Sequence, residues 1–221
     1  MSGIGSNIKK IKNNIPENVT FVAVSKTKPN ADILEAYNAG QRIFGENKVQ
    51  EMVAKHDALP KDIEWHMIGH LQTNKVKLIA PFVKLIHGVD SLNLLKEIDK
   101  QALKNNGIID VLLQFYIATE ETKFGFSFAE ATAMLDSSDY HNLKNIRVVG
   151  VMGMASFSND EAIVRQEFRT LKSYFDSLKS VQFKNANYFK EISMGMSGDY
   201  LIAIEEGSTM VRVGSAVFGD R

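Results

Sequence analysis

A lysine at the end of an apolar run is the first residue in this chain whose position suggests chemistry. In the segment FVAVSKTKP, Val22, Val24 and Lys26 occupy alternate positions, so their side chains share one face of a β-strand. If the valines face a protein interior, Lys26 does too, and partial desolvation favours the neutral amine that attacks an aldehyde to form a Schiff base. A solvated lysine at the strand end is the alternative. Lys28, just before Pro29, is more typical of a loop surface.

Small residues follow two later apolar runs in a pattern that could hold an anion. Ser193, Gly195 and Ser197 in SMGMSGDY come directly before an apolar helical stretch, and Gly214 and Ser215 follow the run MVRV. Glycine and serine leave backbone amides accessible, and the positive end of a helix dipole favours a negative group such as a phosphate. Each turn alone is typical of an ordinary loop, but the two together favour a phosphate site.

Three further polar residues are candidates for ligand contact. Arg212 interrupts an apolar run, and a buried guanidinium needs an acceptor, which could be a ring nitrogen of a ligand, a phosphate or a carboxylate of the protein. Asn47 lies in FGENKVQE and His66 in WHMIGHLQTNK, where His66 is more typical of a hydrogen-bonded core histidine. Met152 and Met154 in VMGMAS are expected to pack in the core. No closely spaced set of His, Asp and Glu suggests a metal site.

Composition and charge narrow the class of protein. Lys plus Arg and Asp plus Glu both number 26, which argues against a nucleic-acid or anionic-membrane partner. The chain has no cysteine, so it has no disulfide or thiolate nucleophile, and a reducing compartment is expected. Neither the N-terminal segment MSGIGSNIKKIKNN nor any later stretch has the apolar run of a signal peptide or a spanning helix. We therefore predict a cytoplasmic location with no membrane partner.

Short β-rich runs alternate with amphipathic stretches from about residue 19 onward, which is typical of βαβ units. The expected strands are 19–25, 41–45, 64–69, 85–89, 110–117, 147–154, 189–194 and 210–218. These alternations, without a linker or a shift in composition, predict a closed (β/α)8 TIM barrel in one domain, 1–221; an open doubly wound sheet is the alternative. In such a barrel, ligands bind at the C-terminal strand ends, where the candidate residues lie.

Two helices are expected from apolar periodicity. The first, 159–179, has Ser158 and Glu161 at the spacing of a capping box, which predicts a start at Asn159. The second spans 91–104, and Gly107 follows where a left-handed residue commonly ends a helix. The apolar face of the first helix consists of Val164, Phe168, Leu171, Phe175 and Leu178.

Six segments occur in the order seen in the YggS/PROSC family of pyridoxal-phosphate homeostasis proteins, and the chain resembles that family over nearly its whole length. They are AVSKTKP, FGENKVQE, WHMIGHLQTNK, VMGMASF, SMGMSGDY and EEGSTMVRVGSAVFG. The resemblance implies a barrel like the N-terminal domain of alanine racemase, with pyridoxal 5′-phosphate (PLP) on Lys26, Asn47 near the ring and Arg212 facing the pyridine nitrogen. It implies phosphate contacts from Ser193, Met194, Gly195, Ser197, Gly214 and Ser215.

The resemblance further implies a homeostatic role in which PLP is held reversibly, its free aldehyde is buffered and apo-enzymes are possible recipients. An arginine against the pyridine nitrogen keeps that nitrogen unprotonated, because two adjacent cations repel, and weakens PLP as an electron sink. Racemases of the related fold also use an opposing tyrosine from an extra C-terminal domain, which is not expected in 221 residues. We predict a non-catalytic, monomeric binding protein; the alternatives are a weak PLP-dependent amino-acid racemase or isomerase with Lys26 as base and, more remotely, a phosphosugar aldolase.

Overall fold

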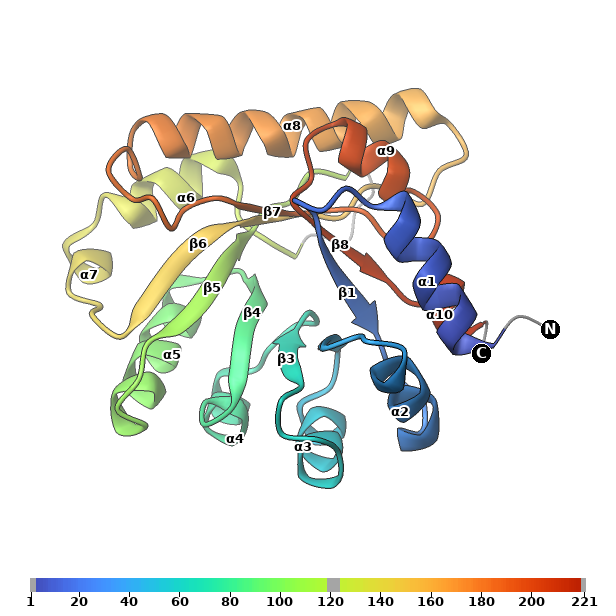
Figure 1. The fold of residues 1–221 in the computed structure, drawn as a ribbon. Helices are drawn as coiled ribbons and strands as arrows, with labels where there is room; N and C mark the ends of the chain where they lie inside the picture. Colours follow the sequence, from blue (N-terminus) through green and yellow to red (C-terminus); the bar gives the residue numbers. More distant parts are fainter. Residues whose placement is uncertain (1–2, 119–123, 220–221) are drawn as a thin grey trace.

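Eight parallel strands close into a barrel surrounded by helices (Figure 1). The computed structural model describes residues 3–118 and 124–219. Each strand pairs with the next one along the chain, and β1 pairs with β8 to close the ring. The predicted (β/α)8 barrel is confirmed, and the open sheet is excluded.

The strands occupy the predicted runs but are mostly shorter. They are β1 Thr20–Val24, β2 Ile43–Glu46, β3 Glu64–Met67, β4 Val83–Val89, β5 Ile109–Gln114, β6 Ile146–Met152, β7 Glu191–Ser193 and β8 Met210–Val213. The prediction that the last strand reaches residue 218 is wrong. Gly214 leaves the extended conformation, with φ −118° and ψ −74°, and the following residues form a short helix, α10 Ser215–Phe218.

The other helical segments of the described chain connect the strands or precede them. One helix that the strand–helix alternation does not anticipate is α1 Ile4–Asn14, which packs against α2 and α10 (Figure 1). The remaining segments are α2 Asn30–Asn38, α3 Val49–Ala58, η1 Thr73–Lys75, α4 Val76–Ile79, α5 Leu92–Lys104, α6 Phe128–Leu135, α7 Ser138–His141, α8 Glu161–Ser180 and α9 Tyr200–Glu205.

The two predicted helices exist, and α5 ends at Lys104 as predicted, but the cap of α8 and the left-handed residue after α5 differ from the prediction. Helix α8 begins at Glu161 because the Asp160 carboxylate accepts the Ala162 amide at 2.9 Å, so the expected capping box with Ser158 is wrong. At the end of α5, the left-handed residue is Asn106, with φ 52°, and not Gly107. The amides of Asn106 and Gly107 donate to the carbonyls of Leu103 and Ala102, which is the pairing of a Schellman motif centred on Asn106.

Apolar residues fill both sides of the strands, but the barrel interior also holds polar groups. A small inner cluster consists of Val22, Leu85, Leu112, Val149, Met152 and Met210. A larger cluster includes α8 residues such as Phe168 and Leu171, both fully buried. His66, His87 and Arg212 lie on barrel strands and are at most 4 % exposed, so they need hydrogen-bond partners inside the protein.

Gly150 provides a test of how tightly β6 and β7 approach each other. A Cβ at this position would lie 1.8 Å from the Glu191 carbonyl oxygen of the paired strand. We expect Gly150→Ala to lower the free energy of unfolding by about 3 kcal/mol, the upper part of the usual range for overpacking. Chemical denaturation measures the change. Gly107→Ala, whose Cβ meets nothing closer than 3.9 Å, serves as the control, and equal stability of the two variants would contradict the packing.

Candidate functional site

Residues that follow six of the eight strands line a cavity of about 630 Å³ at the C-terminal end of the barrel. Its wall includes six of the nine residues predicted from the sequence: Lys26, Asn47, Ser197, Arg212, Gly214 and Ser215. The closed barrel brings them together because β1, β2, β7 and β8 are neighbours in it. The cavity is therefore the candidate functional site.

Lys26 lies two residues after the end of β1 in a tight turn, and its half-buried side chain lines the cavity. The next residue, Thr27, has φ 66°, a left-handed conformation that β-branched residues rarely adopt. The Thr27 amide donates to a carboxylate oxygen of Glu51 at 2.5 Å. Within the described ranges, the Lys26 amine itself has no hydrogen bond or ion pair, so it is available to a ligand in the cavity.

A buried ion pair anchors the turn that carries Lys26. The Lys55 ammonium lies 2.7 Å from Glu46 Oε1, and it also donates to the Ser25 carbonyl and to Glu51 Oε1, both at 2.7 Å. The Ser25 hydroxyl donates to the same Glu46 oxygen at 2.6 Å. Burial raises the pKa of Glu46, while the contacts from Lys55 and Ser25 act in the opposite direction. Helix α3 and strand β2 thus hold the backbone from which Lys26 extends.

Arg212 is buried in the floor of the cavity and is only partly satisfied by the protein. Its Nη1 donates to the Ser193 carbonyl at 2.8 Å and to the Ser193 hydroxyl at 2.5 Å, and its Nη2 donates to the Gly153 carbonyl at 3.1 Å. These bonds use three of the five N–H donors of a guanidinium. Burial lowers the pKa of Arg212 to about 10, with Asp199 acting in the opposite direction, so the group is a cation at neutral pH. The remaining donors are available to a ligand.

The two small-residue turns converge on the hydroxyl of Ser197. This oxygen accepts the backbone amides of Gly214 at 3.0 Å and Ala216 at 3.4 Å. The Asp199 carboxylate accepts the Met196 amide at 2.5 Å, and burial raises the pKa of this carboxyl. The backbone amides of both turns therefore point toward shared oxygen acceptors, the arrangement that also binds an anion.

The structure does not place the other three predicted residues on the cavity wall. Ser193 is fully buried beneath Arg212 and engaged with it. Met194 packs in the core, and its amide donates to the Met210 carbonyl. Gly195 has φ 95°, and a Cβ there would lie 2.6 Å from the Ala203 methyl group, so it allows the chain to turn against α9. These three residues therefore lie behind the cavity wall and not on its surface, where the family resemblance implies them.

Two residues line the cavity against expectation, and two others lie elsewhere. Met154 is 42 % exposed and reaches the wall, so its predicted core packing is wrong, whereas Met152 is buried as expected. Lys28 also lines the cavity, and its ammonium donates to the carbonyls of Phe218 and Gly219. Lys28 therefore lies in a loop as predicted, but its side chain is half-buried rather than on the open surface. His66 is a buried, hydrogen-bonded core residue, and His70 lies beside Asp90 outside this cavity.

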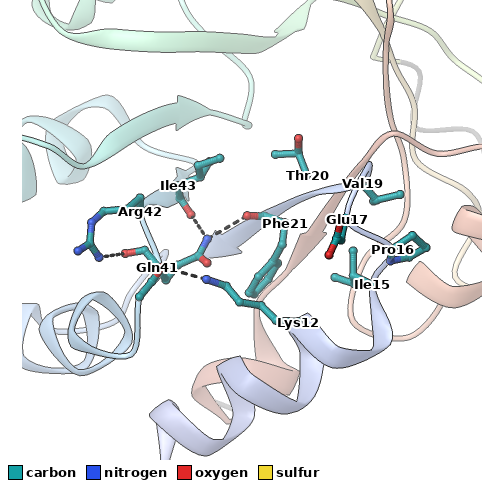
Figure 2. Close-up of a pocket in the computed structure, with 11 residues that line it drawn as sticks. Lys12, Ile15, Pro16, Glu17, Val19, Thr20, Phe21, Gln41, Arg42 and Ile43 are labelled. Carbon is teal, nitrogen blue, oxygen red and sulfur yellow. Dashed lines mark hydrogen bonds between the residues drawn. The ribbon is translucent and has the colours of Figure 1, made fainter.

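Other cavities lined by residues 3–118 and 124–219 contain different groups. One of about 360 Å³ lies beside the start of β1, where the Gln41 amide bridges the carbonyls of Phe21 and Ile43 (Figure 2). None of the predicted ligand-contacting residues lines it. Across residues 3–118 and 124–219, no three His, Asp or Glu side chains are grouped to hold a metal ion, and no helix is both long and apolar enough to cross a bilayer.

Comparison with known proteins places these features in a family. The family model for the alanine racemase N-terminal domain matches residues 1–221. A pyridoxal phosphate homeostasis protein of Aquifex aeolicus is 43 % identical over 91 % of this chain and 86 % of its own length. The corresponding Escherichia coli K12 protein is 34 % identical over 100 % and 98 %. This chain belongs to the pyridoxal phosphate homeostasis protein family.

Solved structures agree with this membership. PipY of Synechococcus elongatus, a protein with 33 % sequence identity, matches 98 % of this chain and all of its own, with a TM-score of 0.91 in the form without PLP and 0.89 in the form with PLP bound. Alanine racemase from Enterococcus faecalis matches 99 % of this chain but 58 % of its own, with 17 % identity and a TM-score of 0.76. That enzyme shares the fold of this family member.

The sequence patterns do not predict the network of Glu46, Lys55 and Ser25 in this homeostasis-family protein. Glu46 lies inside a recognised segment, directly before Asn47, but its partner is nine residues away on a helix. The available signal was a carboxylate at the end of an apolar strand, since such a group is rarely buried without a partner.

Lys55→Met tests the importance of this network. We expect the free energy of unfolding to fall by about 3–5 kcal/mol, because the substitution leaves the Glu46 carboxylate buried without its counter-ion. The double variant with Glu46→Gln is expected to recover part of this loss. Lys172→Met, which breaks an exposed ion pair with Asp176, is the matched control and is expected to cost less than about 1 kcal/mol. Similar losses for Lys55→Met and the control in urea denaturation would show that the buried pair is unimportant.

Proposed function

We propose that this protein holds PLP reversibly as a Schiff base on Lys26 and serves intracellular PLP homeostasis, as a monomer in the cytoplasm. The observation that carries the proposal is the presence in one cavity of an unengaged amine and a buried arginine with unused donors. The Lys26 nitrogen would form a double bond to the aldehyde carbon, and the aldehyde oxygen would leave as water. Because the reverse reaction needs only water, the bond suits storage and release.

The cavity wall offers groups that would contact the pyridine nitrogen, the ring and the phosphate of PLP. Arg212 would direct a free N–H toward the pyridine nitrogen, and its charge would keep that nitrogen unprotonated. Asn47 would lie near the ring. The turns that meet at Ser197, together with Gly214 and Ser215, would hold the phosphate. The predicted contributions of Ser193, Met194 and Gly195 would then come mainly from supporting this wall, because the structure gives their groups other partners.

A carrier is favoured over a racemase by the groups that face the cavity. In the described chain, its lining includes no tyrosine, and general acid–base catalysis requires a second group within hydrogen-bond reach of the reacting carbon. An unprotonated pyridine nitrogen also stabilises a carbanion poorly. The role proposed here is therefore to buffer the reactive aldehyde and release it, with PLP-dependent apo-enzymes as the recipients.

Absorption spectroscopy with borohydride trapping tests the attachment to Lys26. We expect a near-visible band after PLP is added, which borohydride converts into a stable adduct that peptide mapping assigns to Lys26. Lys26→Ala should lose the band. Lys28→Ala should keep it, because the Lys28 amine is directed to the carbonyls at the C-terminal end. An adduct on Lys28, or no band in the wild-type protein, would refute the proposal.

Amino-acid turnover distinguishes a carrier from a weak enzyme. With PLP-loaded protein and L-alanine, we expect no D-alanine beyond the amount formed by free PLP, because Lys28 and Asp199 on the cavity wall bond to backbone groups and no tyrosine is among the described lining residues. Chiral chromatography after prolonged incubation measures the product. Racemisation that disappears in Lys26→Ala would support the racemase alternative.

A further inference from the structure

A chain of buried hydrogen bonds runs through the barrel from Arg212 toward the opposite end. The Ser193 hydroxyl, which accepts from Arg212, lies 2.9 Å from His87 Nδ1. His87 Nε2 lies 3.0 Å from His66 Nδ1. His66 in turn lines a cavity of about 530 Å³ whose other walls include the opposite strand ends, at Thr20, Glu64 and Lys84. The four residues of the chain are at most 4 % exposed.

The chemistry of arginine determines which groups donate and which accept along this chain of hydrogen bonds. A guanidinium only donates, so the Ser193 oxygen must accept from Arg212. The hydroxyl proton of Ser193 is then directed to His87 Nδ1, which must be unprotonated to accept it. His87 therefore carries its proton on Nε2 and donates it to His66 Nδ1. By the same logic, His66 carries its proton on Nε2, on the side of the second cavity.

The opposite direction is disfavoured by an unsatisfied group. If His87 donated from Nδ1, the Ser193 proton would be buried with no other acceptor among the described residues, and such an orphan costs about 1–3 kcal/mol. Additional protonation is also opposed. Burial lowers the pKa of His66 to about 3, helped by Lys84, and burial lowers the pKa of His87 well below its usual value, with its neighbours His66 and Arg212 acting in the same direction.

We propose that His87 and His66 are positioning residues that, through Ser193, hold the Arg212 guanidinium in the orientation that presents its free donors to the cofactor cavity. His87 draws the Ser193 proton away from Arg212, so the serine lone pairs stay directed at Nη1. His66 satisfies the remaining N–H of His87. The part of this inference that concerns the cofactor rests on the proposed function, whereas the direction of the hydrogen bonds from Arg212 to His66 does not.

The charged groups around His66 determine whether its ring could gain a proton near neutral pH. The second cavity places His66 among three cations and three carboxylates, with Arg147 paired to Asp110. The charged lining residues are Glu64, Lys84, Asp110, Arg147, Lys190 and Glu191. These opposite charges are equal in number, so the lining gives no net charge that would drive a proton onto His66 near neutral pH.

Nitrogen NMR of the histidine rings, recorded without PLP, tests the direction. In ¹⁵N-histidine-labelled protein, we expect His66 and His87 to be neutral Nε2–H tautomers whose shifts stay constant from about pH 5.5 to 8.5. His66→Gln and His87→Asn assign the signals. An Nδ1–H tautomer at either ring, or a titration within that range, would overturn the proposal.

Arg212→Met tests whether the arginine sets the direction. Without the donor, the Ser193 oxygen is free of its constraint, and we expect Nδ1–H tautomers to become populated at His87 and His66. Arg169→Met, which affects a surface pair with Glu206, is the control and should leave both rings unchanged. Unchanged tautomers in Arg212→Met would show that Arg212 does not control the chain.

Variants at His87 test the effect on ligand binding. Asn at position 87 retains an acceptor near the Nδ1 position, whereas Leu removes it. We expect His87→Leu to raise the dissociation constant of PLP about tenfold, the equivalent of one hydrogen bond, and His87→Asn to stay within about threefold. Equal losses in the two variants would refute the positioning role. Absence of PLP binding to the wild-type protein would instead refute the proposed function, while the tautomer experiment would remain decisive for the chain.

Discussion

A guanidinium buried inside a parallel barrel must be surrounded by oxygen atoms, and much of the site follows from this requirement. Arg212 lies on β8, between apolar neighbours, and takes its acceptors from the ends of β6 and β7. The protein supplies these acceptors on one side of the guanidinium only. The other side of the guanidinium faces the cavity. Arg212 therefore forms the floor of the site, and its free N–H groups favour a ligand with a hydrogen-bond acceptor.

The second fixed point is the Lys26 turn, which depends on a different kind of interaction. Here Lys55, paired with the buried Glu46, holds the Ser25 carbonyl before Lys26, and Glu51, which also pairs with Lys55, accepts the Thr27 amide after it. In the proposed function, Arg212 is a permanent cation that would contact the ligand without covalent chemistry, whereas Lys26 would be the nucleophile. A carrier needs both: one group that reacts with the aldehyde reversibly, and a rigid partner that recognises the rest of the molecule.

Much of this arrangement could be predicted from the sequence, because it depends on local patterns. Strand alternation predicts the eight strands, and the residue types at the strand ends point to Lys26, Asn47 and Arg212 independently of the family resemblance. The missing parts depend on contacts between distant segments. The link between Glu46 and Lys55, the use of the Met194 amide by β8 and the exposure of Met154 follow from the packing of whole elements. The capping residues also differ from the prediction. Asp160, and not Ser158, caps the start of α8, and Asn106, and not Gly107, is the left-handed residue after α5.

The closure of the barrel by β1 and β8 has a consequence for the synthesis of the protein. Lys26 follows the first strand of the barrel, whereas Arg212, Gly214 and Ser215 lie in or directly after the last one, and Lys28 bonds to the carbonyls of Phe218 and Gly219. Contacts of such long sequence separation form late in folding. A nascent chain in which β8 has not yet been made therefore carries Lys26 without the opposite wall of the cavity, and the complete cavity arises only after β8 has paired with β1.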